Sequence, residues 1–410
     1  MTENRERSKF SIFGPGMIIT ASFVGPGTVT TMTQGGAGFG YSLLWAVVFS
    51  IIATIALQEM VARLALVTNE GLGEAIRDIF NHQLLKLITV WFSMIAVAVG
   101  CAAYISGDLL GTSLGASYLL GIPENYIAPV IGIVILLIGL SGSYDLIEKV
   151  MTVLVLIMGV IFITTVIVIQ PDFGAVLKGA FIPSIPNGSL LTIIALIGTT
   201  VVPYNFFIHA NSIHERFNGI KDLRIVRIVR IDTIVAIGLG GLISAAILIT
   251  AGTLIHGKEV TSLVELSEPL KPVLGDFAPI FMSVGLFSAG LSSAIASPMG
   301  AAATISSCLR WEGGVKSKKY RLVFAIVISI GIITSSLGFE PLEVLLIAQA
   351  LNGIILPLIA ILIFVILNKK NMMGKFANGI VLNIIGIFVV LVVSFLGVYS
   401  LIDAIQSFIR

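Results

Sequence analysis

Charged side chains are scarce in this chain: Asp, Glu, Lys and Arg make up 11% of its 410 residues, whereas 57% are hydrophobic. An ordinary soluble domain carries about 25% charged residues. The mean hydropathy of +1.06 leaves too little polar surface to cover a water-soluble particle. The composition therefore excludes a soluble protein and predicts one that crosses a membrane many times.

The chain also lacks the groups that enzymes and ATP-driven pumps need. Its two cysteines, Cys101 and Cys308, have no metal-ligand spacing, so we expect buried thiols rather than a disulfide or a zinc site. No glycine-rich run ends in Gly-Lys-Ser or Gly-Lys-Thr, and no Ser, His and acidic residue form a catalytic grouping. The net charge of +2 is not gathered into a patch that would bind nucleic acid. We expect no enzyme activity, no cofactor and no nucleic-acid partner.

Apolar segments that are separated by short polar stretches recur from one end of the chain to the other. A helix needs about 20 apolar residues to cross the hydrocarbon layer. Lipid cannot satisfy exposed peptide groups, and the segments lack the alternation of a membrane barrel, so we predict an all-α integral membrane fold with eleven transmembrane helices. The predicted segments are 12–36, 41–67, 87–115, 126–141, 146–170, 187–213, 230–255, 276–308, 321–337, 341–367 and 376–405.

The distribution of basic residues predicts the orientation. If the first segment starts from the cytoplasm, all but four of the 24 Lys and Arg residues lie on the cytoplasmic side; the exceptions are Lys178, Lys258, Lys271 and Arg410. The positive-inside rule then predicts a cytoplasmic N-terminus and an outside C-terminus, in a plasma membrane. Residues 1–10 have no apolar core or cleavage site of their own, so we expect a cytoplasmic tail rather than a signal peptide.

Two of the segments contain helix breakers near mid-membrane. The run Gly25-Pro-Gly interrupts the first segment, and Pro203 interrupts the sixth. Transporters that are built from inverted repeats carry such breaks. We therefore expect two inverted five-helix units, residues 11–170 and 187–367, followed by an additional helix at 376–405. The alternative is that each proline only kinks its helix.

The longest motif in the chain is the ungapped run Gly25-Pro-Gly-Thr-Val-Thr-Thr-Met-Thr-Gln-Gly-Gly-Ala-Gly-Phe-Gly-Tyr-Ser-Leu-Leu-Trp45. It resembles the first helix and following turn of the NRAMP (natural resistance-associated macrophage protein) divalent-metal transporters. Further matches are Leu57-Gln58 with Ala62-Arg63-Leu64, Pro203-Tyr-Asn-Phe-Phe-Ile-His209 and Ser288-Ala-Gly-Leu-Ser-Ser293. The resemblance covers nearly the whole chain. It implies a LeuT-type fold in which helices one and six are broken around a central ion site.

At the metal site that the resemblance implies, the chain departs from the family. Family members bind a transition metal with an Asp and an Asn of helix one, and with a Met and a backbone carbonyl of helix six. The corresponding positions here are Gly25, Thr28, Val202 and Thr199, and none carries a carboxylate or a sulfur. A thioether favours softer ions and oxygen ligands favour hard ones, so the resemblance implies a divergent member that has lost the soft-metal site.

Neutral oxygen ligands remain near the two breaks. We expect the substrate to bind at Gly25, Thr28, Thr199, Val202, Tyr204, Asn205, Gln349 and Asn352, with Thr200 beside them. Carbonyls, hydroxyls and bound water suit Mg²⁺, which keeps several of its waters when it binds to proteins. Charge is the difficulty, because at mid-membrane only the carbonyl ends of the half-helices would offset a divalent ion.

Two titratable residues are candidates for a proton or ion pathway. Asp108 is the one carboxylate deep in an apolar run, and such residues are functional candidates by default. By the resemblance it matches a proton-pathway Glu, a neighbouring family Asp is Ile105 here, and Tyr204 replaces a family histidine. His209 matches a second histidine that is implicated in proton coupling. The losses imply weak or absent coupling. Alternatively, Asp108 caps polar groups between helices and His209 donates an interhelical hydrogen bond.

The leading hypothesis is a secondary transporter of a hard divalent cation, Mg²⁺ or Mn²⁺, that works by alternating access as a monomer in the lipid bilayer. A transporter of a neutral or anionic organic solute is the second, because half-helix N-termini favour carboxylates. A non-transporting sensor is the third.

Two smaller predictions concern charged residues. We expect an ion pair of Glu59 with Arg63, four residues further along the same helix, and attraction of anionic lipid by the basic stretch at 216–230.

Overall fold

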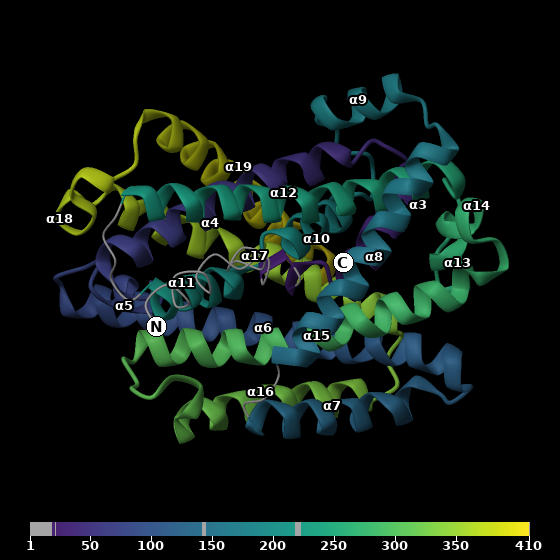
Figure 1. Ribbon diagram of the computed structural model, residues 1–410. Helices are drawn as coiled ribbons and strands as arrows, with labels where there is room; N and C mark the ends of the chain where they lie inside the picture. The colour runs from purple at the N-terminus through teal and green to yellow at the C-terminus, as the bar shows by residue number, and fades with distance from the viewer. Residues whose placement is uncertain (1–18, 21, 142–144, 218–222, 410) are drawn as a thin grey trace.

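The computed structural model describes residues 19–20, 22–141, 145–217 and 223–409, and every regular element among them is a helix (Figure 1). The prediction of an all-α fold is confirmed. The predicted tail at 1–10 and the start of the first segment lie outside the described residues, as do Lys221 and Arg410.

Each predicted segment matches one helix or a pair of half-helices. The first segment contains α3 (Pro26–Phe39), and the sixth consists of α10 (Leu190–Thr200) and α11 (Pro203–Phe217). The other segments are α4 (Leu44–Thr68), α6 (Gln83–Leu120), α7 (Glu124–Ser141), α8 (Asp145–Ile169), α12 (Leu223–Leu254), α15 (Ala278–Cys308), α16 (Lys318–Ser335), α17 (Pro341–Asn368) and α19 (Ile380–Ile409). Within the described residues, eight spans are long enough and apolar enough to cross a membrane by composition alone.

Short helices lie in the connections between the long ones. They are α5 (Leu72–Arg77), α9 (Phe173–Phe181), α13 (Leu263–Ser267), α14 (Lys271–Leu274) and α18 (Lys370–Met373), with 3-10 turns at Glu268–Leu270, Gly275–Phe277, Gly314–Lys316 and Gly374–Phe376. The outward faces of the long helices are apolar: Leu137 of α7 is 63% exposed and Ile167 of α8 is 68% exposed. Such faces are stable against lipid and costly in water, which agrees with the predicted membrane location.

Both predicted breaks are present, but each lies slightly before its predicted position. The first helix is interrupted at Val24 and Gly25, and the sixth at Val201 and Val202, so that Pro26 and Pro203 open the second half-helices. Proline fits the first position of a helix because that position needs no intrahelical N–H bond. The prolines therefore start new helical segments instead of lying inside unwound ones.

Small residues hold the first break against α6 and α15. A Cβ on Gly111 of α6 or on Gly290 of α15 would collide with the ring of Pro26. The two helices also pack against each other along their length. The start of α3 is therefore fixed against the middle of α6, about one turn from Asp108.

The predicted pair of Glu59 and Arg63 exists, and it belongs to a larger network. Glu59 Oε2 lies 3.1 Å from Arg63, and Oε1 lies 2.6 Å from Arg230 of α12. Arg63 also donates to the carbonyl of Phe376 and, at 2.7 Å, to Asn378 before α19. The Glu59 and Arg63 side chains are 6% and 4% exposed, so the centre of the network is buried, while Arg230 at its edge is 46% exposed. The network ties α4, α12 and the segment before α19 together.

Replacing Glu59 by glutamine is expected to destabilise the fold by about 3 kcal/mol, because it leaves the buried Arg63 without its countercharge. Thermal unfolding of the purified protein in detergent measures the effect. The matched control is Glu268→Gln, since Glu268 pairs with Lys258 and Lys271 at an exposed position and is expected to change stability by less than about 1 kcal/mol. Equal melting temperatures for the two variants would contradict the account.

Candidate functional site

The two breaks meet through a pair of threonine hydroxyls. The Oγ1 atoms of Thr28 in α3 and Thr199 in α10 are 2.7 Å apart, and both side chains are buried. Thr28 donates its proton to the carbonyl of Phe23, on the other side of the first break. Thr199 must then donate to Thr28. The predicted convergence of Thr28 and Thr199 is confirmed, and their contact leaves no room for an ion between them in this closed arrangement.

The breaks expose backbone carbonyl groups to the same region. The carbonyls of Ser22 and Thr199 lack their usual helical donors, because the residues four positions later are Pro26 and Pro203. The nearby carbonyl of Gly198 accepts a hydrogen bond from the Tyr104 hydroxyl at 3.3 Å. Carbonyl oxygens at the C-terminal ends of half-helices carry partial negative charge, so they favour a cation.

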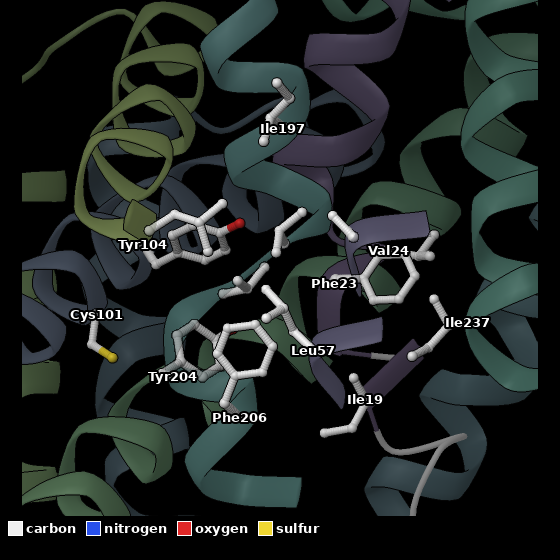
Figure 2. Close-up of a cluster of buried hydrophobic side chains, with 14 of the residues drawn as sticks. Ile19, Phe23, Val24, Leu57, Cys101, Tyr104, Ile197, Tyr204, Phe206 and Ile237 are labelled. Atoms are coloured by element: carbon white, nitrogen blue, oxygen red, sulfur yellow. The ribbon is translucent and has the colours of Figure 1, made fainter. Parts of the chain in front are cut away.

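Tyr204 and Asn205 converge on the end of the first helix. Ser22 donates to Asn205 Oδ1 at 2.9 Å, and its Oγ lies 3.3 Å from the Tyr204 hydroxyl. The Nδ2 group of Asn205 is buried without a partner among the described residues. Figure 2 shows Tyr204 beside Tyr104, whose ring it meets edge to face at 5.7 Å. Tyr204 and Asn205 thus join helices one and six through Ser22, and their role as substrate ligands stays a prediction. The Val202 carbonyl already accepts the Asn205 N–H.

Asp108 lies next to the first break. Its side chain is 1% exposed, and a Cβ built on Gly25 would lie 3.8 Å from its Oδ1 atom. Ser293 of α15 donates to Oδ2 at 2.8 Å, with Ser297 at 3.5 Å, whereas no described residue donates to Oδ1. The expectation that the region of the breaks has no carboxylate is therefore wrong. The side chain comes from α6 instead of from position 25, which alignment of the helix-one motif alone does not reveal.

The remaining predicted ligands divide into near and distant ones. The Gln349 side-chain amide abuts Gly27 in the first turn of α3, and its Oε1 is buried without a partner. Asn352 instead contacts Gly100 of α6 and donates to the carbonyl of Ala348 in its own helix. Thr200 bonds to Leu196 within α10. Asn352 and Thr200 were also expected at the breaks; each side chain bonds to a carbonyl of its own helix, and their role as ligands stays a prediction.

His209 makes the interhelical hydrogen bond that was the alternative to a proton relay. Its Nδ1 atom lies 2.7 Å from Oε1 of Gln58 in α4, and the ring is fully buried. The Nε2 atom has no partner among the described residues. His209 thus connects α4 to α11, and its ring makes no hydrogen bond with Asp108 or with either break among the described residues.

Sequence reasoning did not identify several residues of the site. Ser293 and Gln58 fall within matched motifs and were recoverable as polar side chains in apolar helices. Ser22 and Tyr104 carried no comparable signal, because a single hydroxyl in an apolar segment is common. Cys101 and Cys308 are free and buried, as predicted.

The donor set consists of oxygen atoms. No group of three or more His, Cys, Asp or Glu side chains that could hold a metal occurs among the described residues. One carboxylate, several hydroxyls, two amides and freed carbonyls surround the breaks. Hard cations prefer such ligands, while soft transition metals prefer imidazole and sulfur.

Comparisons with known proteins agree with this geometry. The family model described as "Natural resistance-associated macrophage protein-like" matches residues 16–403. The divalent metal cation transporter MntH of Pectobacterium carotovorum is 27% identical over 97% of this chain and 96% of its own, and MntH of Deinococcus radiodurans is 29% identical over 95% and 88%.

Solved structures show the same fold. A mutant of the Eremococcus coleocola manganese transporter superposes with a TM-score of 0.79 at 20% identity, covering 98% of this chain and 88% of that one. MhsT in complex with L-phenylalanine follows with a TM-score of 0.62 at 16% identity, over 95% and 99% of the chains. The predicted LeuT-type architecture is confirmed. The family model and the MntH relatives bear out the expectation of a membrane transporter rather than an enzyme. From residue 16 to residue 403, the chain belongs to the natural resistance-associated macrophage protein (NRAMP) family.

Proposed function

We propose that this protein carries a hard divalent cation, Mg²⁺ in preference to Mn²⁺, across the plasma membrane by alternating access. The observation that carries the proposal is the Asp108 carboxylate beside Gly25, with its Oδ1 atom unpaired and hydroxyls on its other side. The MntH relatives are named as divalent metal cation transporters, which supports the cation class.

The electrostatics of the site favour this substrate. A divalent ion at mid-membrane is costly unless a nearby negative charge offsets it. Asp108 supplies one negative charge, and the free carbonyls of Ser22 and Thr199 add partial charge. Mg²⁺ releases its waters reluctantly, so we infer that hydroxyls and carbonyls bind it partly through water. Positions 25, 28, 199 and 202 offer no thioether that would favour a softer ion.

Transport requires the site to open. Since the Thr28 and Thr199 hydroxyls are in contact, the half-helices have to separate before an ion enters. We propose that the two five-helix units, residues 11–170 and 187–367, move relative to each other about the breaks. The N-terminus faces the cytoplasm in this proposal, and one copy of the chain suffices.

Uptake into vesicles tests the function. Proteoliposomes that contain the protein are expected to accumulate Mg²⁺, and to a smaller extent Mn²⁺, above empty liposomes. A panel of small organic acids run in the same assay tests the organic-solute alternative. Uptake of an acid without uptake of either ion would replace the proposal, and binding without any uptake would indicate a sensor.

Proton coupling is expected to be weak. His209 is bonded to Gln58 and has no contact with Asp108, so the two titratable groups do not form a continuous relay. Mg²⁺ uptake should therefore leave the vesicle interior at constant pH, as reported by an enclosed pH-sensitive dye. Acidification that scales with the Mg²⁺ taken up would contradict this expectation.

A further inference from the structure

A basic cavity of about 750 Å³ lies at the ends of α4, α12 and α19, and none of the residues at the two breaks lines it. Its polar lining consists of Arg63 of α4, Arg227 and Arg230 of α12, and Lys375 before α19, and no acidic residue among those that the structure describes lines it. In the predicted topology these helix ends face the cytoplasm. We call this site the basic cavity.

Two of the four cations in the basic cavity lack a countercharge. Glu59 pairs with Arg63 and Arg230, so its single negative charge is shared between two guanidinium groups. Arg227 and Lys375 form no ion pair with any described residue. The cavity therefore has an excess of positive charge and suits an anion.

The rest of the lining is apolar and faces outward. Ile231 and Ile234, about two and three turns into α12, are 52% and 43% exposed. Ile380 and Val381 at the start of α19 are 81% and 69% exposed. The cavity thus continues onto helix faces that contact hydrocarbon chains in a membrane. A free inorganic anion would use only the charged part, whereas a phospholipid would use both.

We propose that the basic cavity binds the headgroup phosphate of an anionic phospholipid from the inner leaflet, with its acyl chains along α12 and α19. The phosphate lies between Arg227 and Lys375, and Arg230 contributes while it remains paired with Glu59. Ile380, Val381 and Leu382 of the first turn of α19 line the same cavity, and the N–H groups of a first helical turn have no intrahelical acceptor, so we infer that they add donors. The bound lipid links α12 to α19 through α4, which packs against both helices.

The test compares two double variants of equal charge. Arg227→Gln with Lys375→Gln removes the unpaired cations of the cavity. The control variant, Lys316→Gln with Lys318→Gln, removes two exposed cations. Lys316 precedes α16 and Lys318 is its first residue. Purified protein in neutral detergent is titrated with short-chain phosphatidylglycerol, short-chain phosphatidylcholine or inorganic phosphate while the melting temperature is recorded. Native mass spectrometry counts the lipids that stay bound.

Phosphatidylglycerol is expected to raise the melting temperature of the wild type and of the α16 variant to the same extent. The cavity variant should need about 30-fold more of this lipid for the same shift and should lose one bound lipid in the mass spectrum. The proposal would be overturned if the wild type and the cavity variant needed the same concentration of phosphatidylglycerol for the same shift in melting temperature. It would also be overturned if the cavity variant and the α16 variant lost lipid binding to the same extent. Saturation of the shift by inorganic phosphate or by phosphatidylcholine would also overturn it, in favour of a free-anion site or a nonspecific lipid effect.

Discussion

The Asp108→Asn variant is expected to transport Mg²⁺ at least about 100-fold more slowly than the wild type. Separating a buried ion from its countercharge costs about 3 kcal/mol, which corresponds to that factor. Asparagine has nearly the same shape and still accepts the hydrogen bond of Ser293. The loss therefore reports the missing charge rather than a change in packing. Initial rates of Mg²⁺ uptake into proteoliposomes measure the effect.

Ser297→Ala is the control for this prediction. Its hydroxyl lies 3.5 Å from Asp108 Oδ2, at the limit of a hydrogen bond, so uptake should stay within about threefold of the wild type. Melting temperatures of both variants verify that they fold. If folded Asp108→Asn took up Mg²⁺ at the wild-type rate, cation transport would not depend on this carboxylate. Mg²⁺ uptake by the wild type would still support the transport function.

Thr28→Val is expected to reduce Mg²⁺ uptake by about tenfold. Valine has the shape of threonine but no hydroxyl, so the change removes a proposed ligand, the bond to the Phe23 carbonyl and the contact with Thr199. The loss of a buried hydrogen bond is worth about 1 to 2 kcal/mol. Thr28→Ser keeps the hydroxyl and should retain most of the uptake.

Thr200→Val is the matched control for Thr28→Val. The Thr200 hydroxyl bonds to the carbonyl of Leu196 within its own helix and, among the described residues, makes no hydrogen bond to the first break. Its removal should leave the uptake rate nearly unchanged, although the two threonines are equally buried. If both valine variants lost uptake to the same degree, the loss would reflect packing near the breaks and not the ligand role of Thr28.

The helical architecture was predictable because lipid permits few alternatives. A membrane-spanning chain has to satisfy its own peptide groups, so long apolar segments become helices. The prolines then indicated which helices break. Proline disfavours the helical conformation of the residue before it. The breaks therefore lie one to three residues earlier than predicted, at Val24 and Gly25 and at Val201 and Val202.

The composition of the site was harder to predict. Asp108 and Ser293 are 185 residues apart, and the proximity of Asp108 to Gly25 depends on how the start of α3 packs against α6 and α15. Helical periodicity identifies a polar residue in an apolar helix but not the neighbour that it meets. For the same reason, Asn352 was assigned to the breaks, whereas its side chain contacts Gly100.

The most direct measurement of the central claim is the position of the ion. Crystals soaked in Mn²⁺, which scatters anomalously and stands in for Mg²⁺, are expected to show one peak between Asp108, Thr28 and Thr199. With one intervening water, the peak should lie within about 4.5 Å of Asp108 Oδ1. The peak should disappear in crystals of Asp108→Asn. A peak that persists in that variant, a peak bound only elsewhere, or density for an organic anion at the breaks would contradict the account.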